Sequence, residues 1–241
     1  MTVPTYLHLS TRSLLMAEHA LAGGFDGVVV DMQHGEHDLG SATTLIRSIP
    51  GSLSRTLVRV PRIDSGIIGA VLDAGAGGII APTVETAAQA AALVAAVKFP
   101  PAGGRSLGPL RPGLYAGPSP LAAANDAVRG YAQIESAAGL AALDEILATP
   151  GLDGVYIGPA DLAVSLGRPP RLDWADGPVR AAIDEVIAGA RKAGIAVGIF
   201  CLSGAYAGAL AEARDVDFVG LGTDVGLLAG ASKALIESFR G

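Results

Sequence analysis

The chain contains the segment Gly23-Gly24-Phe25-Asp26-Gly27-Val28-Val29-Val30-Asp31, in which a turn of small residues leads into a short apolar run that ends in a carboxylate. The same design recurs as Gly151-Leu152-Asp153 before residues 154–158 and as Gly75-Ala76-Gly77 before residues 78–82. Short apolar runs bounded by glycine and aspartate are typical of buried β-strands. The segment therefore predicts one unit of a parallel sheet that is repeated along the chain.

Eight such strands are expected, and segments with helical periodicity lie between them. The strands are expected at 6–9, 27–31, 56–60, 78–82, 130–135, 154–158, 195–200 and 218–222, and the helices at 13–22, 39–48, 65–74, 85–98, 137–148, 179–193, 205–213 and 225–239. Apolar strands that alternate with helices favour a parallel sheet covered on both faces. Eight such units in 241 residues favour one closed (β/α)₈ TIM barrel, a single domain spanning residues 1–241.

An open, doubly wound sheet is the alternative fold. Its usual nucleotide-binding signatures are missing, because no Gly-x-Gly-x-x-Gly follows the first strand and no Gly-Lys-Ser/Thr loop occurs in the chain. We therefore expect no nucleotide cofactor.

The composition excludes several classes of protein. Half of the residues are apolar, 17% are charged and the formal net charge is −6, which argues against a disordered chain and against a basic nucleic-acid binder. Cys201 is the single cysteine, so we expect neither an intramolecular disulfide nor a cysteine-based zinc site, and a reducing cytoplasm is the expected location. The mean hydropathy is +0.46, yet no apolar run is long enough for a membrane span, and no membrane partner is expected.

Polar residues gather where the expected strands end. They are Asp31 and His34 after the second strand, Arg59 in the third, Gln133 and Glu135 in the fifth and Asp161 after the sixth, while His8 and Phe200 end the first and the seventh. In a (β/α)₈ barrel the carboxyl ends of all strands meet on one face, where these barrels place their active sites. We therefore expect these side chains to surround one pocket.

Two of these residues form a candidate metal site. Glu135 ends a strand and Asp161 follows the neighbouring strand at the start of a helix, so the two carboxylates are expected to lie close together. Oxygen ligands without cysteine or paired histidines suit a hard divalent cation such as Mg²⁺, Mn²⁺ or Co²⁺. The alternative is that both acids serve only as helix-start residues, which favour negative charge.

The lysines argue against an iminium mechanism, which needs a lysine among the strand ends. The chain has three lysines, Lys98, Lys192 and Lys233, and all fall on expected helices or their ends. We therefore expect no Schiff-base lysine. Polarisation of a substrate carbonyl then falls to the metal and Arg59.

His34 is the best candidate for a general base. Its ordinary pKa lies near neutrality, and it follows Asp31 by three residues, close enough for the carboxylate to orient the imidazole. The alternative is a histidine whose ring is satisfied by the backbone of a loop.

These segments together resemble the HpcH/HpaI family of metal-dependent, pyruvate-specific aldolases over essentially the whole chain. The resemblance rests on residues 25–34, 72–76, 80–82, 99–105, 133–135 and, most specifically, Asp153-Gly154-Val155-Tyr156-Ile157-Gly158-Pro159-Ala160-Asp161-Leu162. It implies reversible cleavage of a 4-hydroxy-2-oxoacid to pyruvate and an aldehyde. A CoA-ester lyase of the malyl or citramalyl type and a non-catalytic barrel that binds a small acid are the alternatives.

The resemblance also implies roles for individual residues. Glu135 and Asp161 would bind the metal, with Gln133 nearby. His34 and Asp31 would form the base dyad, and Arg59 would stabilise an oxyanion. The backbone N–H groups of Gly158, Ala160 and Asp161 would hold the pyruvate carboxylate, and Asp73 would approach the active site of a neighbouring subunit. His8 and Phe200 would border the substrate. The chain departs from many relatives at Met32-Gln33, where they have Gly-Glu, and at His8, where they have Trp, so the natural aldehyde stays open.

A homo-oligomer, a trimer or a hexamer, is the assembly that the resemblance implies. The last expected helix carries apolar residues at 225, 227, 228, 231, 235, 236 and 239, which is more apolar surface than one barrel face needs. We therefore expect this helix to make contacts between subunits. The alternative is an ordinary helix that packs on its own barrel.

Overall fold

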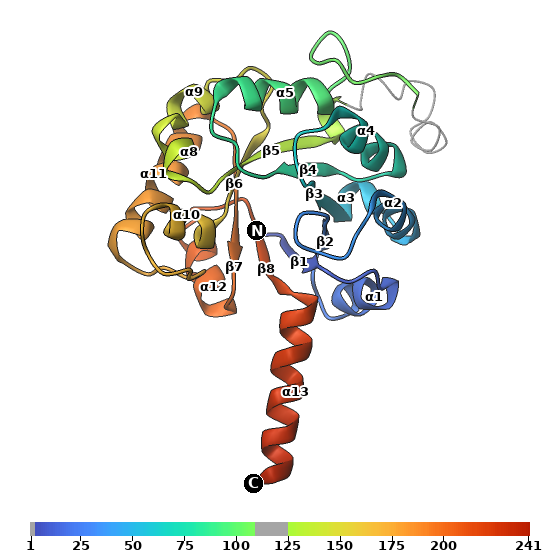
Figure 1. Ribbon diagram of the computed structural model, residues 1–241, viewed down its shortest axis with the longest axis vertical. Helices are drawn as coiled ribbons and strands as arrows, with labels where there is room; N and C mark the ends of the chain where they lie inside the picture. The colour runs from blue at the N-terminus through green and yellow to red at the C-terminus, as the bar shows by residue number, and fades with distance from the viewer. Residues whose placement is uncertain (1–2, 109–124) are drawn as a thin grey trace.

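The computed structural model describes residues 3–108 and 125–241, and its strands close into a parallel barrel in the order β1 to β8 (Figure 1). The strands are β1 (Thr5–Leu9), β2 (Gly27–Asp31), β3 (Thr56–Arg59), β4 (Gly78–Ala81), β5 (Arg129–Ile134), β6 (Gly154–Ile157), β7 (Ala196–Cys201) and β8 (Phe218–Thr223). Thr5 lies opposite Val219, so β8 pairs with β1 and closes the sheet. The predicted single-domain (β/α)₈ barrel is confirmed, and the open sheet is wrong.

Helices surround the barrel on its outer side. They are α1 (Leu14–Ala22), α2 (Leu39–Ser48), α3 (Ser52–Arg55), α4 (Ser65–Ala74), α5 (Ala87–Val97), α8 (Ala137–Ala141), α9 (Leu143–Leu147), α10 (Pro159–Ser165), α11 (Gly177–Ala193) and α12 (Gly204–Glu212), and the exception is α13 (Asp224–Arg240), which follows β8. Side-chain caps set many of the starts: Thr86 accepts a hydrogen bond from the N–H of Gln89, so α5 begins at Ala87 and not at Glu85. None of the helices in the described ranges has the length and apolar character needed to span a bilayer.

The helix expected at 137–148 is wrong as a single element. Ala142, with φ −97° and ψ 12°, leaves the helical range and separates α8 from α9. The apolar period also missed α3 and α10, which have four and seven residues, because so few turns do not establish a period.

The barrel interior consists of an apolar layer with a polar layer above it. Val29, Leu57, Ile80, Tyr131, Tyr156 and Phe218 form the inner apolar cluster. Successive side chains of a strand point to opposite faces, so the residue two positions further also points inward. Tyr6 is thus followed by His8, Val29 by Asp31, Leu57 by Arg59 and Tyr131 by Gln133. The carboxyl end of the barrel is therefore polar, because the last inward-facing residue of each of these strands is polar and the one before it is not charged.

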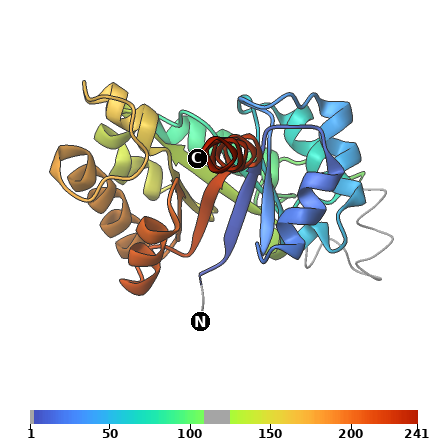
Figure 2. The same cartoon turned by 90° about the horizontal axis from the view of Figure 1, so that it is seen from below.

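Helix α13 extends away from the barrel (Figure 1) and is seen end-on in Figure 2, between the elements of the amino-terminal half and α11 and α12. The buried carboxylate of Asp224 accepts hydrogen bonds from the N–H groups of Ser10 and Thr11 and fastens the first turn to the end of β1. Every residue from 225 to 241 is exposed, including Leu235 at 75% and Phe239 at 85%. The alternative of a helix packed on its own barrel is therefore wrong.

Candidate active site

A cavity of about 180 Å³ lies at the carboxyl end of the barrel. Its lining consists of His8, His34, Arg59, Gln133, Tyr156, Gly158, Pro159, Ala160, Asp161, Leu172, Phe200 and Thr223. Eight of these residues are candidates that the sequence identified. Two further candidates, Asp31 and Glu135, lie directly behind the lining, where they contact Arg59 and Gln133. The structure thus brings these ten candidates together around one space.

Arg59 and Asp31 form a buried ion pair at the ends of β3 and β2. Arg59 Nε donates to Asp31 Oδ1 over 3.0 Å and Nη2 donates to Oδ2 over 2.5 Å. Burial favours neutral Asp31, but the hydrogen bonds and charge of Arg59 outweigh it and lower the pKa of Asp31 below its ordinary value. Burial likewise acts against the charge of Arg59, while Asp31 raises its pKa. Both groups are therefore charged, and the guanidinium is fixed beside the cavity.

His34 lies in the turn after β2 with an exposed side chain that lines the cavity. Asp31 Oδ1 accepts hydrogen bonds from the backbone N–H groups of Gln33 at 3.0 Å and His34 at 3.2 Å. The expected contact between Asp31 and the imidazole therefore needs correction. Both carboxylate oxygens of Asp31 bind Arg59, and Oδ1 also binds the backbone of the turn. Asp31 therefore holds the turn that carries His34 and does not contact the imidazole through a hydrogen bond.

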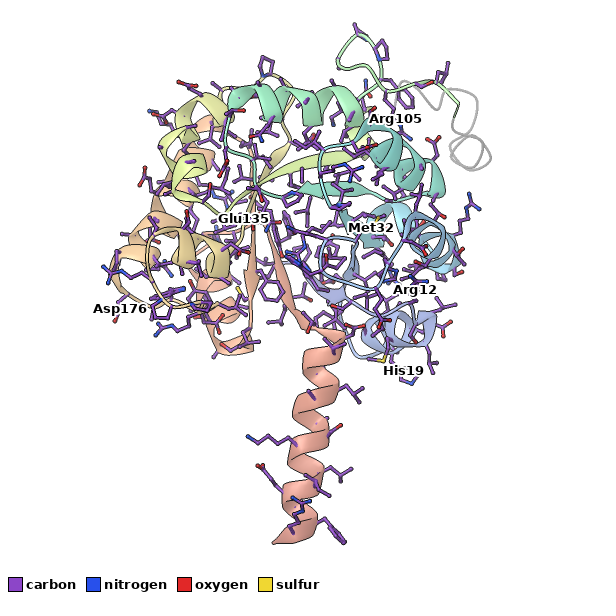
Figure 3. The ribbon with its side chains drawn as sticks, viewed as in Figure 1. Arg12, His19, Met32, Arg105, Glu135 and Asp176 are labelled. Atoms are coloured by element: carbon purple, nitrogen blue, oxygen red, sulfur yellow. The ribbon has the colours of Figure 1, made fainter. Side chains whose placement is uncertain are left out.

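Glu135 follows β5 and lies toward the centre of the barrel in Figure 3. Its Oε1 accepts hydrogen bonds from the Thr83 N–H at 2.7 Å and the Thr83 hydroxyl at 3.0 Å, and its Oε2 accepts one from the Gln133 amide. Burial raises the pKa of Glu135; the Thr83 hydrogen bonds oppose that shift, and the negative charge of Asp161 adds to it. The site therefore contains a buried carboxylate beside a second negative charge.

Gly158 and Asp161 form the turn from β6 into α10. A Cβ atom at Gly158 would lie 2.6 Å from Glu135 Oε2 and 2.8 Å from Gln133 Nε2, so only glycine leaves room for these groups. The Gly158 N–H donates to the Ile134 carbonyl at 3.2 Å. The prediction that the Gly158 N–H binds the substrate carboxylate is therefore wrong, because this N–H continues the pairing between β5 and β6. The N–H groups of Ala160 and Asp161 belong to the first turn of α10, where a helix has no internal acceptors for them.

The donor set fits a hard divalent cation. Within residues 3–108 and 125–241, no group of three or more histidine, cysteine, aspartate or glutamate side chains is arranged to hold a metal. Glu135 and Asp161 are a pair, and they would supply two ligands of an octahedral ion. Gln133 Oε1 is buried with no hydrogen-bond partner in the described chain. Burial and, to a smaller extent, repulsion from Asp161 raise the pKa of Glu135, and a bound cation would offset both. The remaining positions suit oxygens of a substrate and water.

The lysines lie away from this cavity. Lys98 Nζ donates to the Val128 carbonyl at 2.7 Å and to Asp153 at 2.9 Å, and these partners precede β5 and β6 at the amino end of the barrel. Lys192 lies on α11 and Lys233 on α13. A substrate in the cavity has no neighbouring amine from these residues.

Asp73 is the one candidate that the structure places elsewhere. It lies on α4, where its carboxylate accepts a 2.5 Å hydrogen bond from Arg105. It does not line the cavity of its own chain, which leaves its expected role in a neighbouring subunit as a prediction.

Thr83 and Tyr156 are two site residues that sequence reasoning missed. Thr83 has a φ of +52°, a conformation that β-branched residues rarely adopt and that is typical of functional sites. It follows β4 by two residues, so the strand-end rule would have found it had it been extended past Pro82. Tyr156 lies inside β6, and its hydroxyl lies 2.9 Å from His8 Nε2.

Known proteins resemble this chain along nearly its whole length. A sequence model of the HpcH/HpaI aldolase/citrate lyase family matches residues 5–231. A hydroxypyruvate/pyruvate aldolase from Rhizorhabdus wittichii is 42% identical over 96% of this chain and 92% of that protein. A 5-keto-4-deoxy-D-glucarate aldolase from Klebsiella pneumoniae is 36% identical over 90% and 84%. A crystal structure of an HpcH/HpaI aldolase/citrate lyase family protein from Burkholderia cenocepacia matches with a TM-score of 0.88 and 32% identity, over 100% of this chain and 95% of that one.

Proposed function

The chain belongs to the HpcH/HpaI aldolase/citrate lyase family, and we propose that the cavity at the carboxyl end of its barrel is the active site. The protein is a class II pyruvate aldolase, a carbon–carbon lyase that cleaves a 4-hydroxy-2-oxoacid to pyruvate and an aldehyde. The observation that carries the assignment of the site is the placing of Glu135, Asp161, Arg59 and His34 around one cavity. The catalytic domain comprises residues 1–241.

His34 serves as the general base of the cleavage. Its imidazole accepts the proton of the C4 hydroxyl, directly or through water, and the C3–C4 bond breaks as the C4 oxygen becomes the aldehyde carbonyl. The bonding electrons pass to C3 and the oxo oxygen, which gives the enolate of pyruvate. The guanidinium of Arg59, held by Asp31, stabilises the negative charge that develops on this oxygen. A proton then returns to C3.

The family is metal-dependent, and Glu135 and Asp161 are the residues that would hold the cation here, with Mg²⁺, Mn²⁺ or Co²⁺ as the candidates. Such a cation supplies a Lewis acid that draws electron density from the oxo group. Thr83 and Gln133 orient Glu135 through their hydrogen bonds. Their contribution is to fix the carboxylate before the substrate arrives.

The substrate carboxylate is bound by the N–H groups of Ala160 and Asp161 at the start of α10, where backbone donors and the helix dipole favour an anion. His8 from β1 and Phe200 from β7 also line the cavity. We expect the aldehyde part of the substrate to lie against these two rings.

Assembly into a homo-oligomer, a trimer or a hexamer, accounts for α13. Most helices in proteins gain their stability from tertiary packing, which α13 lacks beyond its first turn, since Leu235 and Phe239 are exposed. A second copy of the chain would cover its apolar residues. Asp73 would then approach a neighbouring active site. The buried free thiol of Cys201 suits a reducing cytoplasm.

Incubation of the protein with pyruvate in deuterium oxide tests this function. We expect C3 deuterium exchange that a chelator abolishes and added Mn²⁺ restores, together with cleavage of a 4-hydroxy-2-oxoacid. A non-catalytic binder would give no exchange. Trapping of pyruvate on the protein by borohydride would contradict the metal-dependent mechanism, because only an iminium is reduced to a stable adduct.

A further inference from the structure

His8 is held rigidly inside the barrel at the end of β1. Its side chain is 1% exposed and lines the cavity. The imidazole meets the Phe200 ring edge-on, with centroids 4.9 Å apart. A Cβ atom at Gly220 would lie 2.7 Å from His8 Nε2, so the missing side chain at this position is what admits the ring. The orientation of the imidazole is therefore set by its neighbours on β7 and β8.

The contact with Tyr156 fixes the position of the imidazole proton. Among the described residues, the Tyr156 hydroxyl has His8 Nε2 as its hydrogen-bond partner, at 2.9 Å. Burial raises the pKa of Tyr156, so the hydroxyl keeps its proton and needs an acceptor. Nε2 is that acceptor. Burial, with the charge of Arg59, lowers the pKa of His8 to about 3, so the imidazole is neutral and carries its proton on Nδ1.

The Nδ1 atom is buried and has no hydrogen-bond partner within the described ranges. Buried donors without acceptors destabilise a fold and are rare, unless a ligand supplies the acceptor. We propose that His8 is a specificity-determining residue whose Nδ1–H donates a hydrogen bond to a hydroxyl oxygen of the substrate. This inference rests on the proposed function and deepens it, because it names the kind of substrate that the cavity selects.

A neutral hydroxyl is the acceptor that fits this position best. The negative groups of the substrate have their partners elsewhere, since Arg59 carries a positive charge and the start of α10 attracts a carboxylate. The neighbours of His8 include the aromatic ring of Phe200, the Tyr156 hydroxyl and, opposite it in the register of β1 and β8, Thr223. The nearby charges of Arg59 and Asp31 are paired with each other. A single uncharged donor among such neighbours discriminates between a hydroxyl and a methyl group.

The hydroxyl has two possible sources with the same chemistry. It could belong to the aldehyde or to C3 of a hydroxylated oxoacid, and the relative from Rhizorhabdus wittichii is named a hydroxypyruvate/pyruvate aldolase. Two pairs of substrates distinguish the sources. Glycolaldehyde and propanal, each with pyruvate, differ only by a hydroxyl in place of a methyl group. Hydroxypyruvate and 2-oxobutanoate, each with propanal, place the same difference on C3 of the oxoacid.

The test measures the ratio of kcat/KM within each pair for the whole protein and for His8→Phe, His8→Asn and Tyr156→Phe. We expect the wild-type protein to prefer the hydroxylated member of one pair by at least roughly 10-fold, because a site built for a hydroxyl penalises its loss. His8→Phe should reduce this preference to within about 3-fold. His8→Asn should keep more of the hydroxyl preference than His8→Phe does, because the asparagine amide nitrogen lies close to the position of Nδ1. Tyr156→Phe should weaken it, because the imidazole proton is then free to move to Nε2.

Preferences that stay unchanged in both pairs for His8→Phe would overturn the proposal. Should that variant not fold, an unchanged preference in Tyr156→Phe would have the same consequence. A wild-type protein that shows no hydroxyl preference in either pair would also overturn it. Pyruvate deuterium exchange by the wild-type protein, which requires no aldehyde, separates these failures from failure of the proposed function.

Discussion

Replacing Arg59 by methionine is expected to lower the free energy of unfolding by about 3–5 kcal/mol at pH 7, because it leaves the buried Asp31 carboxylate without its partner. The side chains are 14% and 3% exposed for Arg59 and Asp31, so water cannot replace the lost contacts. The variant loses two charge-assisted hydrogen bonds, at 3.0 and 2.5 Å. Each is of the kind that contributes about 1.5–3 kcal/mol, which agrees with the first figure.

The pH dependence of this loss follows from Asp31. Its pKa is lowered in the folded protein, so the pair contributes stability that is present above the ordinary carboxyl pKa and is lost as the pH falls through the folded value. In Arg59→Met, burial without the guanidinium raises the pKa of Asp31, and protonation of Asp31 then removes the cost of a buried, unpaired charge. The difference from the wild-type protein should therefore shrink as the pH falls.

Urea unfolding of the wild-type protein, Arg59→Met and the double variant Arg59→Met/Asp31→Asn measures the effect. The double variant should regain more than half of the lost stability, because the amide carries no buried charge. A loss below about 1 kcal/mol in Arg59→Met, or no recovery in the double variant, would show that the pair does not stabilise the fold as described. Arg59→Lys, which keeps the charge but not the planar fork, should still cleave the oxoacid at least roughly 10²-fold more slowly.

Further expectations concern the base, the carboxylate and the assembly. His34→Ala should lower kcat by roughly 10²- to 10⁴-fold in steady-state cleavage assays while Mn²⁺ binding, followed by electron paramagnetic resonance, persists. Because the pKa of Glu135 is raised, acidification should weaken Mn²⁺ binding at a higher pH than it would for an ordinary carboxylate. Thr83→Val removes the hydroxyl that donates to Glu135 and should raise the pH at which half of the Mn²⁺ affinity is lost, whereas Thr83→Ser keeps the hydroxyl and should not. Leu235→Glu with Phe239→Glu should reduce the mass in light scattering, whereas a wild-type protein that is active as a 24.1 kDa monomer would contradict the assembly.

The barrel and its polar layer could be predicted because both depend on the period of the strands. The run that ends at Asp31 is apolar throughout, so a strand buried on both faces was evident, and parity placed Gln133 and Glu135 on one side. The carboxyl ends of parallel strands then meet by topology alone. This reasoning located the residues around the cavity without any knowledge of their contacts.

The details that escaped prediction depend on backbone angles and on competition for partners. The φ of +52° at Thr83 has no signature in a threonine, and no pattern shows that Arg59, rather than the imidazole of His34, takes the oxygens of Asp31. Pairing of β5 with β6 similarly uses the N–H of Gly158. The apolar residues of α13 indicated a buried face, but a period cannot tell whether that face is covered by its own barrel or by another copy.

A titration of the metal-free protein with Mn²⁺, in which bound metal and C3 deuterium exchange of pyruvate are measured in the same samples, tests whether Glu135 and Asp161 hold the cation that the reaction needs. We expect that one Mn²⁺ binds per chain, that exchange rises in proportion to bound metal, and that Glu135→Gln and Asp161→Asn lose both together while their barrels stay folded. Full exchange with no metal bound, or undiminished metal binding in both variants, would contradict the assignment of Glu135 and Asp161 as the residues that hold the cation.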